Sequence, residues 1–438
     1  TPELARDLRW VLLALIGSYS RVYAVNQGIK SRDSVRALRF LAMCATAFCV
    51  LFGYAIARPA TESLFMESYG VENEPFVWIV SPLVGVGIVG AYNRYAARAS
   101  LARSMATVCG LSMLVLTTIL GARGAGVPGA TFFLYVWKDF YIVFLVEIFW
   151  IYANAVYPAR SARWAYGAFL GWGAAGGYVG NLSVGPYAKA IGTANALWLV
   201  IPTLLGAALV FAWATRDFVV NRPDAGEAVP FVDGFRRVVR NKTLTVILAL
   251  VGLSQLAVTL IDFRWKLEIQ NTIADTASRT DAAGMIYGAI SIMELALQLV
   301  AGPILKLVGS SGVLLAVPFL LTVGMATLVG APNATLLSSL KVASKGFDYS
   351  IFRIAKEMLY IPLSYADKSR GKPVIDILGY RAAKGAISLL LIIPWLQSTG
   401  WVDVLTIGAL LLWSAVTVFA LQKRHVGTNP TAKDAKPA

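Results

Sequence analysis

Runs of about twenty apolar residues recur along the chain, from Ala37 to Ala420. A run of this length can cross the ~30 Å hydrocarbon core of a bilayer as an α-helix. Hydrophobic residues make up 57% of the 438 residues and charged residues only 14%, against about 25% charged in soluble domains. The sequence therefore predicts an all-α polytopic membrane protein, and it excludes a soluble enzyme, a disulfide scaffold and a disordered chain.

We predict twelve membrane spans, divided six and six by the longest internal polar stretch, a plan that resembles the major facilitator superfamily. The approximate spans are 37–57, 75–93, 104–121, 130–156, 164–187, 194–214, 243–265, 283–306, 311–330, 334–362, 373–397 and 401–422. The predicted parts are an N-terminal cytoplasmic or interfacial segment (1–36), an N-terminal six-helix half (37–215), a central cytoplasmic loop (216–242), a C-terminal six-helix half (243–422) and a disordered cytoplasmic tail (423–438).

The net charge of +15 is first explained by topology, because Lys and Arg collect in cytoplasmic loops. Basic residues concentrate in alternate loops and in both terminal segments, so we expect cytoplasmic termini and the bacterial inner membrane. The opposite loops are predicted to hold Arg58, Lys189 and Lys266, beside Glu62 and Glu74. The apolar segment 10–19 is too short to span and predicts an interfacial helix. Without an initiating Met, the chain is expected to be a fragment or a processed product.

Cysteine and histidine offer little chemistry. The three cysteines lie in apolar runs without a CxxC spacing, and the single histidine, His425, lies in the tail. We therefore expect no enzyme activity, no cofactor and no metal site. The glycines between Gly171 and Gly180 stand at small-xxx-small spacings, which predicts close packing of one helix on a neighbour.

Charged residues within the predicted spans are the main functional signal. Each costs ~2.5–3.5 kcal/mol on insertion scales, and such groups line cavities or pair with one another. Internal ion pairing is the simpler alternative for any one of them. The basic residues are Lys138, Arg264, Lys341, Lys345, Arg353, Lys356, Arg381 and Lys384, and the acidic ones are Asp139, Glu147, Asp262, Glu294, Asp348, Glu357 and Asp376.

The span 334–362 concentrates these charges on one side. At about 100° per residue, a continuous helix would carry Lys341, Lys345, Asp348, Phe352 and Lys356 on one stripe. We expect Asp348 to pair with Lys345 or Lys341. The next span carries a second stripe, made of Asp376, Tyr380 and Lys384 with Arg381 beside it. Two adjacent basic helices predict a path for a multiply charged anion, and phosphate fits best because Lys offers a compact charge and Arg a bidentate fork.

The stretch 345–363, KGFDYSIFRIAKEMLYIPL, resembles the ATP/ADP translocases of plastids and obligate intracellular bacteria. Their pattern there is approximately K-x-x-x-Y-S-x-F-x-x-x-K-E-x-x-Y-I-P-L, and the likeness continues through Lys368, Lys372 and Lys384. Weaker echoes extend it over most of the chain, from about Arg39 to Leu421. The resemblance implies a fold similar to the major facilitator superfamily and movement of nucleotides by ATP/ADP exchange or proton-coupled import.

Carried over by position, the resemblance implies roles for single residues. Lys356 matches a family lysine, and Asp262 falls where the family has a functional glutamate. Two positions depart from the pattern, because Thr61 replaces a functional lysine and Lys138 replaces a functional glutamate. The resemblance still predicts the fold and the preference for an anion, but these two departures argue against ATP/ADP exchange itself.

We therefore predict a secondary active transporter of a nucleotide or related organic phosphate, working by alternating access. The alternatives are a proton-coupled carrier or flippase of another anionic metabolite or lipid, and a non-transporting sensor or scaffold. We expect membrane lipids as partners, no nucleic acid, and a monomer. The expected substrate ligands are Arg58, Lys345, Phe352, Lys356, Tyr380, Arg381 and Lys384, and the expected coupling or ion-pair residues are Lys138, Asp139, Asp262, Asp348 and Asp376.

Overall fold

The computed structural model describes residues 27–96, 99–157, 159–216, 231–361, 363–364, 372, 374–375 and 378–427. Every regular element in these ranges is a helix. The expected interfacial helix at 10–19, most of the central loop and the end of the tail lie outside the described residues. Below, residues 27–216 are called the N-terminal half and residues 231–427 the C-terminal half.

The helices of the N-terminal half follow the apolar runs of the sequence. They are α2 (Gln27–Tyr69), η1 (Val71–Asn73), α3 (Glu74–Ala96), α4 (Leu101–Gly124), α5 (Ala130–Val156), α6 (Ala159–Ile191), α7 (Thr193–Ala196), η2 (Leu197–Leu199) and α8 (Val200–Thr215). Ser100 caps α4, because its side chain accepts a hydrogen bond from the backbone N–H of Arg103. The first span is longer than predicted, since α2 continues through Pro59 to Tyr69.

The C-terminal half is built in the same way. Its elements are α9 (Phe231–Arg240), α10 (Lys242–Thr272), α11 (Thr276–Gly330), α12 (Ala334–Tyr349), α13 (Ile351–Met358), the π-helical turn η3 (Leu378–Ala382), α15 (Ala383–Leu391), η4 (Pro394–Gln397) and α16 (Thr399–Gly427). Within the predicted central loop, α9 is an additional helix. Seven helices of the described residues are long and apolar enough to cross a membrane, so the count of twelve spans stays a prediction.

Two breaks divide long helical segments. Gly309 has φ 75° and ψ 164° inside α11, a backbone conformation that glycine adopts at low cost. This break separates the predicted spans 283–306 and 311–330. Ser350, with φ −118° and ψ −103°, separates α12 from α13. The predicted single stripe along 334–362 is therefore wrong, because Phe352 and Lys356 belong to a second helix with its own direction.

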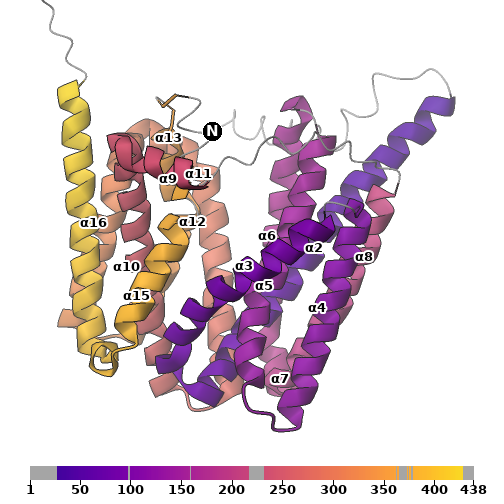
Figure 1. Ribbon diagram of the computed structural model, residues 1–438, viewed down its shortest axis with the longest axis horizontal. Coiled ribbons are helices and arrows are strands. Elements are labelled where there is room, and N and C mark those ends of the chain that lie inside the picture. Colours follow the sequence, from indigo (N-terminus) through magenta and orange to yellow (C-terminus); the bar gives the residue numbers. More distant parts are fainter. Residues whose placement is uncertain are drawn as a thin grey trace, which may run out of the picture.

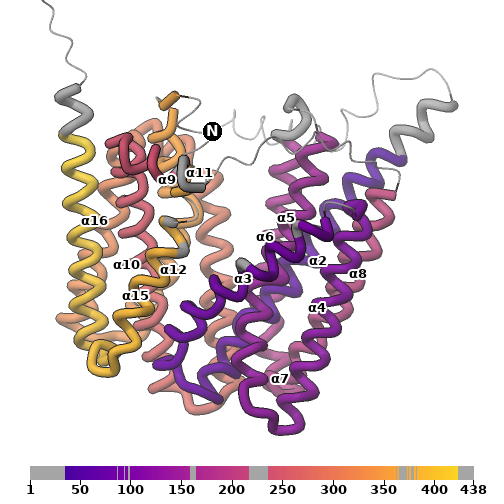
Figure 2. The backbone as a smooth tube through the Cα atoms, in the orientation of Figure 1, coloured from indigo at the N-terminus to yellow at the C-terminus, as the bar shows by residue number. Residues whose placement is uncertain are grey.

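The helices form two bundles that stand side by side (Figure 1). The backbone trace shows the indigo-to-magenta N-terminal bundle beside the pink-to-yellow C-terminal one (Figure 2). In the N-terminal bundle α6 lies directly on α2, because a Cβ at Gly176 would collide with the carbonyl oxygen of Phe48. This contact confirms the close helix packing predicted from the glycine spacing.

Three buried apolar clusters hold the bundles together. One is drawn from residues 42–214 and a second from residues 238–413. The third combines Phe65, Trp78 and Tyr135 of the N-terminal half with Phe263 and Ile387 of the C-terminal half. It lies beside the charged residues described next, so the two halves meet through both apolar and polar contacts.

Candidate functional site: a buried charge network between the two halves

Glu62, on α2, lies at the centre of a buried group of charges. Its Oε1 lies 3.3 Å from Arg58 Nε and 3.6 Å from Lys138 Nζ of α5. Its Oε2 lies 3.4 Å from Lys266 Nζ of α10 and accepts a 2.5 Å hydrogen bond from the Tyr287 hydroxyl of α11. Only 3% of Glu62 is exposed, and a buried carboxylate needs such partners to remain charged. Glu62 therefore joins four helices from both halves.

Lys266 is the second centre of this network. Its Nζ lies 2.9 Å and 3.0 Å from the two carboxylate oxygens of Glu74, at the start of α3. It also lies 3.6 Å from Asp262, one helical turn earlier on α10. Asp262 in turn forms an ion pair with Lys341 of α12. Glu62, Glu74, Lys266, Asp262 and Lys341 thus form one connected chain of charges.

Aromatic rings surround the cations of the network. The Arg58 guanidinium lies 3.9 Å from the ring centroid of Tyr287, and Lys138 Nζ lies 3.7 Å from that of Tyr135. Lys341 Nζ lies 5.3 Å from the ring of Trp265. Cation–π contacts of this kind contribute about 0.5–2 kcal/mol, more where water is excluded. They help to hold buried cations that would otherwise lack hydration.

The two halves make their polar contacts at one end of the molecule. Glu74 and Lys266 lie there, and Lys189 Nζ bonds Asp281 at 2.5 Å. Gln270 donates to Glu72 at 3.0 Å and accepts from the backbone N–H of Val71 at 2.6 Å. This end is opposite α9 and α13 in Figure 1. It is the end that the charge pattern of the loops places outside the cell.

Two predicted anion ligands lie beside this network without an acidic partner. Lys345 Nζ of α12 lies 5.6 Å from the ring centroid of Tyr349, and Lys384 Nζ of α15 lies 4.7 Å from that of Trp78. Neither lysine has a carboxylate within 4.0 Å among the described residues. Coulombic interactions connect Lys384 with Lys345, and also with Lys138 and Asp139. The structure therefore brings these two lysines to the edge of the charge network.

Other predicted ligands lie in different surroundings. Phe352 is 1% exposed, and its ring lies 5.0 Å from that of Trp413 in the core, which favours packing over stacking with a substrate. Lys356 Nζ, on α13, lies 3.9 Å from Glu357 and 5.4 Å from the ring centroid of Tyr380. Lys356 and Tyr380 thus lie together.

Some of the predicted coupling residues belong to the charge network and others do not. Lys138 Nζ bonds Asp139 at 2.7 Å, and Asp262 pairs with Lys341, so these three belong to the network. Asp348 instead accepts 3.0 Å and 3.1 Å hydrogen bonds from Gln255, so the expected pairing with Lys345 or Lys341 is wrong. Asp376 and the side chain of Arg381 lie outside the described residues.

Sequence reasoning named Arg58 as a substrate ligand but missed Glu62, Glu74, Lys266 and Tyr287 as members of the network. It assigned Arg58, Glu62, Glu74 and Lys266 to outer loops, whereas the last three are at most 3% exposed and all four lie in or next to long helices. The reason is that α2 and α10 extend by several residues beyond the apolar runs. The i,i+4 spacing of Arg58 with Glu62, and of Asp262 with Lys266, was the available signal. No sequence pattern indicated that Tyr287 belongs to the network.

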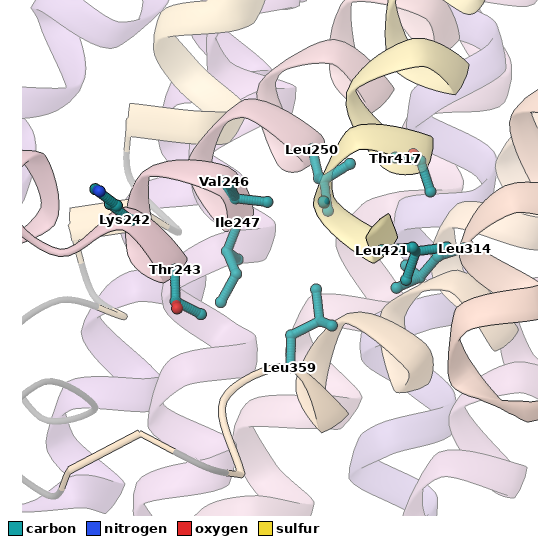
Figure 3. A pocket seen from close by; sticks show the side chains of 10 residues that line it. Lys242, Thr243, Val246, Ile247, Leu250, Leu314, Leu359, Thr417 and Leu421 are labelled. Carbon is teal, nitrogen blue, oxygen red and sulfur yellow. The ribbon is translucent and has the colours of Figure 1, made fainter. Parts of the chain in front are cut away.

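A separate pocket lies within the C-terminal half. Its walls are mostly apolar, as Figure 3 shows, with Lys242 at the edge. The lining residues are Lys242, Thr243, Val246, Ile247, Leu250, Leu314, Leu359, Thr417, Ala420 and Leu421. An anion has too few partners there, because Lys242 is the only charged residue of the lining. The charge network between the halves is therefore the stronger candidate site.

Comparison with known proteins agrees with this picture. The family described as "TLC ATP/ADP transporter" matches residues 219–425. The ADP,ATP carrier protein 3 of Rickettsia prowazekii is 20% identical over 79% of this chain and 84% of its own length. The chloroplastic ADP,ATP carrier protein 2 of Arabidopsis thaliana is 22% identical over 84% of this chain and 72% of its own length.

The chain is a divergent relative of the ATP/ADP translocases. This confirms the resemblance found in the stretch 345–363, and the relatives are carriers rather than enzymes. Solved structures agree on the fold. The nucleoside transporter NupG matches with a TM-score of 0.64 and 13% identity, over 89% of this chain and all of NupG. An inward-facing bacterial homologue of the iron transporter ferroportin matches with a TM-score of 0.66 and 11% identity, over 88% and 98%. The fold is thus that of major-facilitator-like transporters.

The two departures from the translocase pattern fall inside the network. Thr61 is fully buried next to Glu62, and its hydroxyl has no hydrogen-bond partner among the described residues. Lys138, which the sequence resemblance sets at the position of a family glutamate, pairs with Glu62 and Asp139. Both changes therefore alter the charge of one small region, where α2 faces α5.

Proposed function

We propose that this membrane transporter moves a nucleotide or a related organic phosphate across the bacterial inner membrane by alternating access. Two kinds of evidence support the proposal. The relatives are named as ADP,ATP carriers, and two lysines beside the charge network have no carboxylate within 4.0 Å among the described residues. We further propose a monomer with both termini in the cytoplasm, in keeping with the basic loops.

The observation that carries the proposal is the pair Lys345 and Lys384. Both are half-buried, both come from the C-terminal half, and neither has a carboxylate within 4.0 Å among the described residues. A lysine held away from water is costly unless an anion accompanies it, and phosphate oxygens make strong charge-assisted hydrogen bonds. Lys384 also contacts Trp78 of the N-terminal half. A bound anion at this place would touch both halves.

The network suggests how the halves would move. Glu74–Lys266 and Glu62–Tyr287 join the halves at the end predicted to face outward. For that end to open, these contacts must separate, and the freed charges must find other partners. A bound anion can supply part of that compensation next to Lys266. In this proposal Lys138, Asp139 and Asp262 couple substrate binding to the exchange of partners.

Uptake into proteoliposomes tests the proposal. Radiolabelled nucleotides should accumulate with the purified protein, and Lys345→Gln and Lys384→Gln should each reduce uptake at least about tenfold by removing a charge-assisted contact. Lys306→Gln is the matched control, because Lys306 is an exposed lysine on the same half. Failure of a folded, monodisperse protein to bind or transport any phosphorylated compound would exclude the proposal and favour a carrier of another anion, or a sensor.

A further inference from the structure

The buried charges of the network balance one for one. Its cations are Arg58, Lys138, Lys266 and Lys341, and its carboxylates are Glu62, Glu74, Asp139 and Asp262. Every cation lies within ion-pair distance of at least one of these carboxylates, and every carboxylate of at least one of these cations. Buried charges that are paired in this way largely cancel one another's electrostatic attraction for a ligand. The network alone therefore attracts no anion strongly.

Among the residues that the structure describes, the surplus next to the network consists of Lys345 and Lys384. Coulombic repulsion acts between these two lysines, and Asp139 of the network attracts Lys384, but no described carboxylate lies within 4.0 Å of either lysine. Each ammonium instead faces an aromatic ring, at 5.6 Å for Lys345 and 4.7 Å for Lys384. Two like charges beside a neutral network make a site that is complete only with a ligand of about two negative charges.

The remaining charges nearby belong to other groups. Asp348 is bound by Gln255 and interacts electrostatically with Glu294, which also interacts with Arg353. Lys356 lies beside Glu357 on α13, beyond the break at Ser350. Lys372 also pairs with Glu357. Together these residues carry three positive and three negative charges, so they do not change the surplus next to the network.

We propose that the site selects a compound with a single phosphate group over di- and triphosphates. This inference rests on the proposed function and names its substrate class. A phosphate monoester carries about −1.5 to −2 charges at pH 7, which matches the two surplus lysines. Each further phosphate group adds negative charge next to Asp139, which interacts electrostatically with Lys384. Every cation of the network already has a carboxylate partner among the described residues. Repulsion between these carboxylates and the extra phosphate groups is strong in a site shielded from water, so it selects against di- and triphosphates.

Binding to the purified, full chain measures this preference. Adenosine and uridine, their mono-, di- and triphosphates, and inorganic phosphate are compared without divalent metal, by thermal shift and calorimetry. The monophosphate of at least one nucleoside should bind at least about tenfold more tightly than its di- and triphosphates. A diphosphate or triphosphate that binds as well as or better than the monophosphate would overturn the inference, but the proposed function would stand. If no phosphorylated compound binds, the proposed function fails, and the inference with it.

Two variants test the charge count directly. Asp139→Asn removes one negative charge and leaves Lys138 with Glu62 alone, so the preference for mono- over diphosphate should shrink about tenfold. Asp139 suits this change, because it is the most exposed of the four carboxylates, at 28% of its side chain. Lys384→Gln removes a surplus charge and should weaken monophosphate binding at least about tenfold.

The controls separate charge from structure. Lys306→Gln should leave both affinities unchanged, and gel filtration should show monodisperse protein for every variant compared. If Asp139→Asn fails to fold, Lys345→Gln replaces it in the comparison, with the same weakening expected as for Lys384→Gln. An unchanged ratio of mono- to diphosphate affinity in folded Asp139→Asn protein would overturn the charge argument.

Discussion

Lys266 of α10 and Glu74 of α3 form a two-pronged ion pair that links the two halves of the molecule, at 2.9 Å and 3.0 Å. Both side chains are at most 1% exposed. Taking two charges out of water is expensive, so the pair adds less to stability than the loss of one partner removes. The Glu74–Lys266 pair is therefore suited to a contact that forms in one conformation of the transporter and separates in another. Its separation costs little free energy as long as both charges find new partners.

The first prediction concerns this pair. Glu74→Gln should destabilise the protein by about 3–5 kcal/mol, because Lys266 then loses its closest carboxylate in a buried site. Lys266→Met should be worse, since it leaves Glu74, Glu62 and Asp262 with fewer cations. Thermal unfolding in detergent measures both changes. The double variant should be less destabilised than the sum of the single ones, and strict additivity would show that the two residues are not coupled.

A second prediction separates the two roles of Tyr287. Tyr287→Phe removes the hydrogen bond to Glu62 but keeps the ring beneath the Arg58 guanidinium, so it should cost about 1.5–3 kcal/mol. Tyr287→Ala loses the ring as well and should cost more, because a cavity forms. The difference in unfolding temperature between the two variants reports the contribution of the ring. Equal effects would mean that Arg58 does not depend on it.

The sequence predicted the fold better than the site, and particular residues show why. Apolar runs mark α4, α5 and α16 within a few residues, because hydropathy is a local property. The pairing of Glu74 with Lys266 joins positions 192 apart in the chain, and no local pattern reports such a contact. The break at Ser350 was also missed, since neither Pro nor Gly interrupts the helix there. A periodicity argument assumes a continuous helix and fails at such a break.

The third prediction concerns the break at Gly309. Gly309→Ala should destabilise the protein by about 1–2 kcal/mol, because an L-residue is strained at φ 75°. Space is not the cause, since a Cβ there meets no atom within 4 Å. Gly252→Ala is the matched control, because a Cβ there also meets no atom within 4 Å but the residue lies inside the continuous helix α10. The control should be neutral or slightly stabilising, and a similar loss in both variants would contradict the explanation.

Topology supplies the fourth prediction. A cysteine at Ser68, which is exposed at the end where the halves meet, should react with an impermeant maleimide added outside cells. A cysteine at Gly226, in the central loop, should react only after the membrane is opened. Of the native cysteines, Cys44 and Cys109 are buried and Cys49 is half-buried, so labelling of the unsubstituted protein gives the background. Labelling of the Gly226 variant in intact cells would reverse the predicted orientation.

The last prediction concerns Lys356, which lies on α13 beside Glu357 and Tyr380. Lys356 lies beyond the break at Ser350, on α13, and we expect it to meet the anion on the cytoplasmic side of the two surplus lysines. Lys356→Gln should weaken binding of all phosphorylated compounds about tenfold, at the lower end for a charge-assisted contact, because Glu357 already offsets part of the charge.

Unlike Asp139→Asn, the change at Lys356 should affect mono- and diphosphates alike, because Lys356 lies outside the balanced network. Lys356→Arg should also bind less well, since a planar guanidinium does not replace a compact ammonium in a buried site. Lys306→Gln again serves as the exposed control. Gel filtration and unfolding temperature should stay close to those of the wild type. If Lys356→Gln instead unfolds the protein while the surviving fraction binds ligand normally, Lys356 is a structural partner of Glu357 and not a ligand of the anion.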